Sequence, residues 1–173
     1  MGIIKSSVIF TAFFDQSRRI DEITKYDAPA VSLTGVDVKG AGIMGTINIP
    51  GTGMVESMQW VVSARGRRDN VERLSRPGEH SQEIRYLQDT YDSSQPSNRL
   101  TQDIVKEFLT GIFKGNEGGS SEVGTLVETT VTYECLRIQR FVNGVETLLI
   151  DKDAQIYRVN GVDYWENIRS LLK

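Results

Sequence analysis

Residues 131–150 read VTYECLRIQRFVNGVETLLI, and this stretch is the clearest indication of the fold. Both arms, 131–142 and 145–150, are rich in the β-branched, aromatic and aliphatic residues that are typical of strands. Between them stands Asn143-Gly144, a pair that tolerates the positive φ angles required at both central positions of a type I′ turn. The stretch therefore predicts an antiparallel β-hairpin.

The first arm of this hairpin changes the face that carries its apolar residues. Val131, Tyr133 and Cys135 share one face, whereas the next apolar residues are Leu136 and Ile138. Because side chains alternate strictly along a strand, the shift predicts either a β-bulge near Cys135 or a strand buried on each face in turn. Such a strand can leave one sheet for another.

Further strand patterns lie earlier in the chain, within residues 45–113. We predict a second hairpin from 45–49 and 54–64, joined by a turn at 50–53, and two strands at 83–91 and 100–113. Within 54–64 one face is strictly apolar, with Met58, Trp60, Val62 and Ala64. The glycine-rich segment 115–119 is interpreted as a loop inside one domain.

Two short helices are expected at the remaining patterned segments. One covers 69–74. The other covers 163–172, with Asp163 at the cap and Glu166 three positions on, the spacing of a capping box. In the second helix Trp165, Ile168 and Leu172 fall on one face, so that face is expected to dock on a sheet.

Length and composition favour one soluble domain covering residues 1–173. The net charge is -3 and the pI about 5.3, so no overall basic field attracts nucleic acid or an anionic membrane. The single cysteine excludes an internal disulfide and a four-cysteine metal site. No apolar run approaches membrane-spanning length and no secretory signal is evident. The low cysteine count fits a reducing site of synthesis.

The sequence offers little to support catalysis. His80 is the only histidine and is interpreted as an exposed loop residue, and a pairing with Cys135 would need long-range folding. Carboxylates such as Asp15 are interpreted as solvated charges. The glycines of 39–45 lack the flanking residues of a phosphate-binding loop. We therefore predict no enzyme, no catalytic residues, no cofactor and no metal site.

One charge cluster supports an alternative function. It contains five arginines interrupted by Asp69 and Glu72, and it could contact phosphates in a nucleic-acid-binding β-domain. Its mixed signs fit better with a charged helix or a salt-bridged contact between subunits. The arginines are Arg65, Arg67, Arg68, Arg73 and Arg76.

Several motifs resemble the major tail tube proteins of contractile-tailed phages and phage-tail-like bacteriocins. The C-terminal region carries 129–133 (TTVTY), the turn at Asn143-Gly144, 149–151 (LID) and 159–163 (VNGVD), in the order found in that family. A second match is 39–45 (KGAGIMG). A departure lies at 114–119, where relatives tend to carry a Lys-Glu-(Ile/Val)-Asp stretch and this chain is glycine-rich.

The resemblance implies a mainly β fold of two packed antiparallel sheets with one or two short helices. Six subunits would close into a ring whose strands form a continuous β-barrel around a lumen, and rings would stack into a tube. The implied partners are further copies, the sheath, the baseplate or initiator, the terminator, the tape-measure protein and, in a phage, transiting DNA, without membrane binding. The tube would belong to a virion tail or an extracellular phage-tail-like particle.

Candidate contact residues follow from the glycine-rich and turn motifs, which could reach the next ring: Gly40, Gly42, Met44, Gly45, Pro50, Gly51, Asn160 and Gly161. Candidate lumen residues are Glu56, Glu128 and Glu134. Three destinations stay open at this point: a DNA-conducting phage tail, a membrane-depolarising bacteriocin and an effector-delivering particle.

Overall fold

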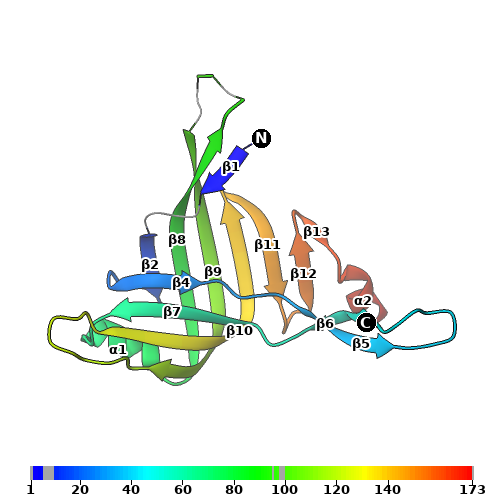
Figure 1. Cartoon of the computed structure of the whole chain (residues 1–173), viewed down its shortest axis with the longest axis horizontal. Coiled ribbons are helices and arrows are strands. Elements are labelled where there is room, and N and C mark those ends of the chain that lie inside the picture. The colour runs from blue at the N-terminus through cyan, green and yellow to red at the C-terminus, as the bar shows by residue number, and fades with distance from the viewer. Residues whose placement is uncertain (1, 6–9, 95, 98–99, 173) are drawn as a thin grey trace.

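The computed structural model describes residues 2–5, 10–94, 96–97 and 100–172, and these residues are mainly β (Figure 1). In chain order the elements are β1 Gly2–Lys5, β2 Phe10–Asp15, β3 Arg18–Arg19, β4 Ile23–Asp27, β5 Leu33–Val38, β6 Ile47–Val55, β7 Gln59–Arg65, α1 Asp69–Glu72 followed by the 3₁₀ turn η1 Arg73–Ser75, β8 Glu79–Asp92, β9 Leu100–Glu117, β10 Glu128–Val142, β11 Val145–Asp151, β12 Ile156–Val159, β13 Val162–Asp163 and α2 Glu166–Leu171.

Two antiparallel sheets are present, as predicted. The main sheet has 11 strands, with β13-β12-β11-β10-β9-β8-β2-β3 as its central path, and the smaller sheet consists of β5 and β6. Strand β7 pairs with both β10 and β4, and this branch folds over the β2-β8-β9 part (Figure 1). The two packed layers therefore both belong to the main sheet, which curls around the core.

The curl happens in β10, where the sequence predicted an irregularity. Residues 128–134 pair with β7, residues 137–142 pair with β11, and the register against β9 shifts between Cys135 and Arg137. Leu136 is the extra residue of a bulge, so Cys135 and Ile138 both point into the core. The bulge, one of the two predicted alternatives, is confirmed; the strand changes its partner there but stays within the main sheet, so the suggested move to another sheet is wrong.

The hairpin at Asn143-Gly144 is also confirmed. Asn143 has φ 50° and Gly144 has φ 81°, the two positive values that the turn needs. The two strands predicted at 83–91 and 100–113 are confirmed as β8 and β9, which run to 14 and 18 residues and pair with each other. Strand β9 continues to Glu117, so the glycine-rich loop begins later than predicted but still connects two strands of one sheet.

The predicted hairpin between 45–49 and 54–64 is wrong. Residues 50–53 lie inside β6, which pairs with β5, and the chain reverses in the loop 39–46 instead. Pro50 is tolerated in a strand because a two-stranded ribbon leaves one side of each strand free of backbone pairing. Strand β7 pairs elsewhere because its apolar face must reach the core.

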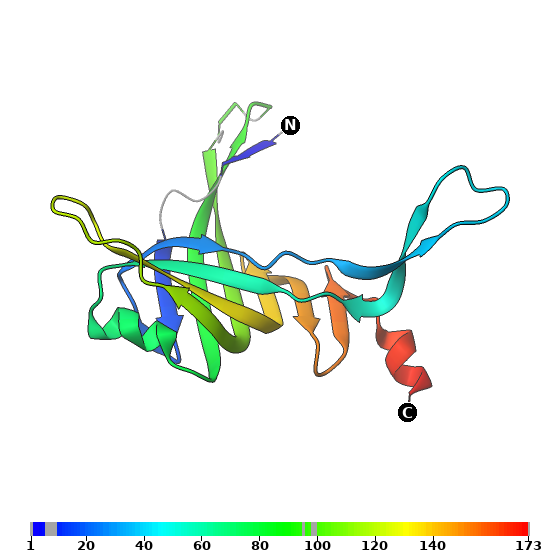
Figure 2. The ribbon, with the colours of Figure 1, turned by 60° about the horizontal axis from the view of Figure 1, so that its bottom comes forward.

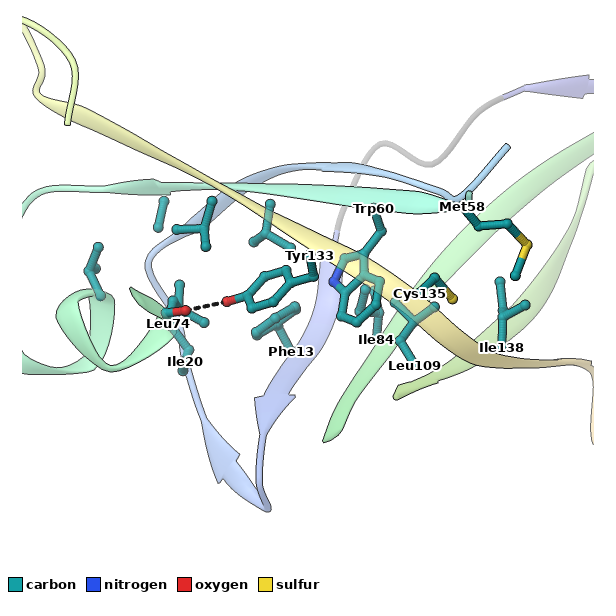
Figure 3. Packing of buried hydrophobic residues seen from close by; sticks show 14 of the residues in the cluster. Phe13, Ile20, Met58, Trp60, Leu74, Ile84, Leu109, Tyr133, Cys135 and Ile138 are labelled. Carbon is teal, nitrogen blue, oxygen red and sulfur yellow. Dashed lines mark hydrogen bonds between the residues drawn. The ribbon is translucent and has the colours of Figure 1, made fainter. Parts of the chain in front are cut away.

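That core is centred on an aromatic stack (Figure 3). The Trp60 and Tyr133 rings lie 4.8 Å apart and nearly parallel, at 18°. Each polar tip has a partner: the Trp60 indole donates to the Gln82 side-chain oxygen at 2.9 Å, and the Tyr133 hydroxyl donates to the Leu74 carbonyl at 2.6 Å. The predicted helix at 69–74 is confirmed, and its Val71 and Leu74 close one end of the core.

The C-terminal helix is shorter than predicted, and the predicted capping box is wrong. Helix α2 begins at Glu166, while Asp163 ends β13; its side chain accepts from the Trp165 backbone at 3.0 Å and from Arg169 at 2.5 Å. Only the first residue of the apolar face is buried: Trp165 packs at 5.4 Å from Tyr157, whereas Leu172 is exposed. The short helix docks through Trp165.

Candidate assembly surfaces

The ribbon of β5, β6 and their loop, residues 33–55, forms an arm that projects from the body (Figure 2). Most of its apolar side chains are exposed: Val36 is 67% exposed, Ile49 52% and Met54 63%. Contiguous exposed apolar side chains on a soluble protein mark a surface that another protein covers. The arm is therefore a candidate contact surface.

Six of the predicted contact residues lie on this arm. Gly40, Gly42, Met44 and Gly45 are in the loop at its tip, where Met44 is fully exposed, and Pro50 and Gly51 are in β6. Gly42 and Gly45 have φ +91° and +107°, and a Cβ on either would meet nothing within 4 Å. Glycine is thus required there for backbone conformation, not for space.

Asn160 and Gly161 lie elsewhere, in the turn between β12 and β13. Their φ values of 49° and 83° make this a second tight hairpin turn. The turn lies at one edge of the main sheet. The structure therefore places the predicted contact residues on two separate surfaces.

Within the described part of the chain, the central path of the main sheet begins and ends in very short strands. Strand β3 has two residues and pairs with Phe14 and Asp15, while β13 has two residues and pairs with Arg158 and Val159. Short edge strands limit indiscriminate pairing, yet they leave most of the neighbouring strand available to a specific partner.

Strands β4 and β7, with the half of β10 that pairs with β7, fold over the β2-β8-β9 part and are called the covering layer here. The three predicted lumen residues lie in or next to this layer. Glu128 accepts a hydrogen bond from Thr24 at 2.5 Å, and Glu134 accepts from Ser57 at 2.8 and 2.9 Å. Both belong to the half of β10 that pairs with β7. Glu56 is exposed in the connection between β6 and β7.

His80 is buried, so the prediction of an exposed loop histidine is wrong. It lies in β8 with 0% exposure; its Nδ1 is 3.1 Å from Asp15 Oδ1 and its Nε2 is 2.7 Å from the Arg76 carbonyl. A carbonyl only accepts, so Nε2 carries a proton, and the carboxylate favours a second proton on Nδ1. Burial opposes the charge, but the hydrogen bonds to Asp15 and Arg76 outweigh it and raise the pKa of His80.

The same contacts overturn the interpretation of Asp15 as a solvated charge, since it is 4% exposed. Together these groups tie β2, β8 and the turn after η1 into one unit. The Cys135 thiol donates instead to the Arg137 carbonyl at 3.5 Å. Burial raises the pKa of this thiol to about 12, which disfavours the thiolate that a Cys-His pair would use.

A second buried polar group was missed at the sequence level. Glu107 in β9 has 0% exposure and accepts from Tyr26, from the Tyr86 hydroxyl at 3.2 Å and from Arg140 Nε at 2.5 Å. Burial and the neighbouring Glu107 charge raise the pKa of Tyr86 to about 12. Strand alternation was the available signal, because Val105, Glu107 and Leu109 share a face.

The arginine cluster is engaged in contacts within the subunit. Arg67 donates to the Gly118 carbonyl at 2.8 Å and Arg76 to the Glu79 carbonyl at 2.7 Å. Arg65 and Arg68 line a hollow that also contains Asp21 and Glu22. These contacts fit the structural interpretation of the cluster.

Other kinds of site find no support in the residues described. No three His, Cys, Asp or Glu side chains are grouped there in a way that could hold a metal ion. None of the helices in this part of the chain is long and apolar enough to cross a membrane.

The chain has an exposed apolar arm, short strands at the sheet edges, and buried polar clusters that connect neighbouring strands. These features are typical of one class of protein, a β-structured subunit that assembles with other subunits. The model of the phage tail tube protein FII family matches residues 8–172. The chain belongs to this family, and it is a structural subunit of a tail tube, a component of a virion or phage-tail-like particle.

Two solved structures are similar to the chain. One is a chain from the cryo-EM structure of an extracellular contractile injection system, the PVC sheath-tube complex in its extended state. It is 8% identical, with a TM-score of 0.48 over 75% of this chain and 86% of that one. The other is from the PVC sheath/tube terminator in the extended state, with 8% identity and a TM-score of 0.47 over 75% and 91%. No curated protein sequence matches significantly.

Proposed function

We propose that six copies of this chain, each acting as a single tube domain over residues 1–173, close into a ring, and that rings stack into a hollow tube inside a contractile sheath. The observation that carries this proposal is the arm, a surface that buries its apolar side chains only when another copy covers it. The family match supports the tube, and the arm supplies the contact.

Ring closure uses the two edges of the main sheet. The β2-β3 edge and the β12-β13 edge lie at opposite ends of the same sheet, so one copy's edge meets the other edge of the next. This heterologous contact continues around a ring until the ring closes, and closure leaves neither of these two edges exposed. The turn at Asn160-Gly161 would then lie at the lateral contact.

Stacking uses the arm. Its six-residue β5 extends roughly 20 Å at about 3.3 Å per residue, which is long enough to cross the boundary between two rings. The glycine-rich tip with Met44 would pack on the adjacent ring. Because head-to-tail stacking grows without limit, partners that start, measure and end the tube are required.

The remaining partners and the location follow from this role. The tube would associate with a sheath, a baseplate or initiator, a terminator and a tape-measure protein, after synthesis in the bacterial cytoplasm. The subunit would have no catalytic activity, cofactor or membrane affinity of its own. The lumen would conduct DNA in a phage, or ions or effectors in a phage-tail-like particle.

The experiment compares two exposed apolar loop residues. Met44 at the arm tip and Val123 in the loop between β9 and β10 are both fully exposed, at 104% and 107%. Under negative-stain electron microscopy the unmodified chain should form tubes of stacked rings. Met44→Asp should stay soluble and folded by circular dichroism but form at most isolated rings, whereas Val123→Asp should form normal tubes.

A tube-forming Met44→Asp variant would refute the role of the arm tip. Absence of tubes from the unmodified chain, under conditions in which it is folded and concentrated, would count against self-stacking itself. Bulky residues at Gly42 and Gly45 should act like Met44→Asp. The control is Gly124→Val, which has the same kind of backbone, φ +84°, and equally open surroundings outside the arm.

A further inference from the structure

The main sheet has one covered face and one open face. The covered face packs against β4, β7 and η1 through buried side chains such as Ile84, Leu109 and Ile138. The side chains between them point the other way and surround a shallow hollow over β2, β8, β9 and β10, which we call the open face. They include Phe14, Glu83, Arg85, Phe108, Thr110, Arg137, Gln139 and Phe141.

Three arginines of the open face each have a carboxylate partner on the same face. Arg85 lies 2.5 Å from Glu83, Arg137 lies 3.4 Å from Asp151, and Arg158 lies 3.2 Å from Glu146. Gln139 connects two of these pairs, since it donates to Glu146 at 2.9 Å and accepts from Arg137 at 3.0 Å. The pairs form a band that crosses from β8 to β12.

Strand alternation places Glu79, Asp89 and Lys106 on this face as well, and cross-strand pairing adds Arg19 opposite Phe14 and Asp163 opposite Arg158. Among the described residues named here, the carboxylates of the open face outnumber its basic groups by one. Its aromatic residues are likewise engaged within the face: Arg85 lies over the Phe14 ring at 5.1 Å, and Phe108 meets Phe141 edge-on at 5.8 Å. The three paired arginines and these aromatic rings therefore have partners within the face.

Ring closure decides which face turns inward. When a sheet closes into a barrel, its concave side has less room than its convex side. The covered face carries a second layer of strands and a helical turn, so it fits only on the outside of a narrow ring. The open face, which carries side chains alone, fits on the inside.

We propose, on the basis of the proposed tube, that the open face lines the lumen and that its paired charges make the wall nearly neutral toward a passing polymer. A wall of unpaired arginines would hold a polyanion through many simultaneous phosphate contacts. A wall whose arginines already have carboxylate partners lets the polymer slide. The alternative is the prediction from the sequence, in which Glu56, Glu128 and Glu134 line the lumen.

Gold labelling of single cysteines distinguishes the two assignments. Thr110→Cys puts a thiol on the open face and Glu128→Cys puts one on the covering layer, while the native Cys135 is buried and unreactive. Tubes assembled from a small fraction of each variant are treated with a maleimide gold cluster. Gold from Thr110→Cys should lie along the tube axis, and gold from Glu128→Cys at the tube margins.

The opposite distribution would overturn the assignment. So would Thr110→Cys tubes that stay unlabelled while the dissociated variant and the Glu128→Cys tubes react, because Thr110 would then be buried between subunits. Failure of the unmodified chain to form tubes would instead refute the proposed function.

The neutral wall is tested with a fluorescent single-stranded oligonucleotide added during assembly. The double variant Glu83→Gln, Glu146→Gln removes two carboxylate partners. Its tubes should retain at least tenfold more oligonucleotide at low salt than unmodified tubes, and should release it as salt rises. Glu72→Gln, Glu122→Gln makes the same charge change away from the open face and should retain no more than unmodified tubes. Equal retention by the two double variants would refute the neutral wall.

Discussion

Gly111 should be the least replaceable glycine of the core. It lies in β9 opposite the bulge of β10, and a Cβ built on it would be 2.0 Å from the Glu134 carbonyl oxygen and 2.5 Å from the Trp60 ring. The first contact is with backbone, which cannot rotate away. Gly111→Ala must therefore push β9 from β10 or displace the indole from its stack on Tyr133.

The expected destabilisation can be estimated from overpacking. Extra methyl groups in a well-packed core cost about 1–3 kcal/mol, and a clash with both backbone and a fully buried ring should reach the top of that range or exceed it, so we expect about 3 kcal/mol. The assay is urea unfolding of the unassembled chain, followed by Trp fluorescence. The midpoint should fall with little change in the dependence on denaturant.

Gly115→Ala is the matched control, since it lies in the same strand and a Cβ there would meet nothing within 4 Å. It should leave the free energy of unfolding within about 0.5 kcal/mol of the original. If Gly111→Ala proves equally mild, then the close approach of β9, Trp60 and the bulge is not what holds the core together.

Two further predictions concern the buried polar groups. His80 keeps its proton to a higher pH when folded than its usual 6.5, so the stability it adds is complete below that pH and is lost as pH rises through its folded pKa. Unfolding midpoints should therefore fall above pH 6.5, and His80→Gln should remove that part of the pH dependence; an unchanged profile would contradict the charged pair with Asp15. Arg140→Met should cost about 3–5 kcal/mol by leaving the Glu107 carboxylate buried without a cation. The double variant Arg140→Met, Glu107→Gln should recover much of that loss in the same unfolding measurement, and no recovery would show that packing, not charge, was lost.

Local patterns in the sequence were sufficient for the individual strands and for the irregularity in β10. The Asn143-Gly144 turn needs only two residues with positive φ, and the parity change at Cys135 is visible within a single strand. The family resemblance carried by 129–133 and 159–163 was similarly local, and the family match confirms it.

The pairing of strands and the contacts of buried polar side chains were harder to predict. The turn-like 50–53 suggested that the strand before it pairs with the strand after it, but the chain runs straight through and β6 pairs with β5. Glu107 and His80 looked like ordinary polar residues. Their burial depends on Tyr26, Arg140, Asp15 and the Arg76 carbonyl, all distant in sequence or supplied by backbone.

Alternation, turn chemistry and short motifs act between near neighbours, so the chain's residues were sufficient to predict a cysteine-poor β protein with a type I′ hairpin, an irregular central strand and the motifs of a tail tube subunit. The three-dimensional fold was needed to show that β10 changes partners at its bulge, that the arm projects from the body and that one face of the main sheet is covered while the other is open. Those features depend on contacts between strands far apart in the chain, and burial of the Trp60–Tyr133 core selects among the possible pairings.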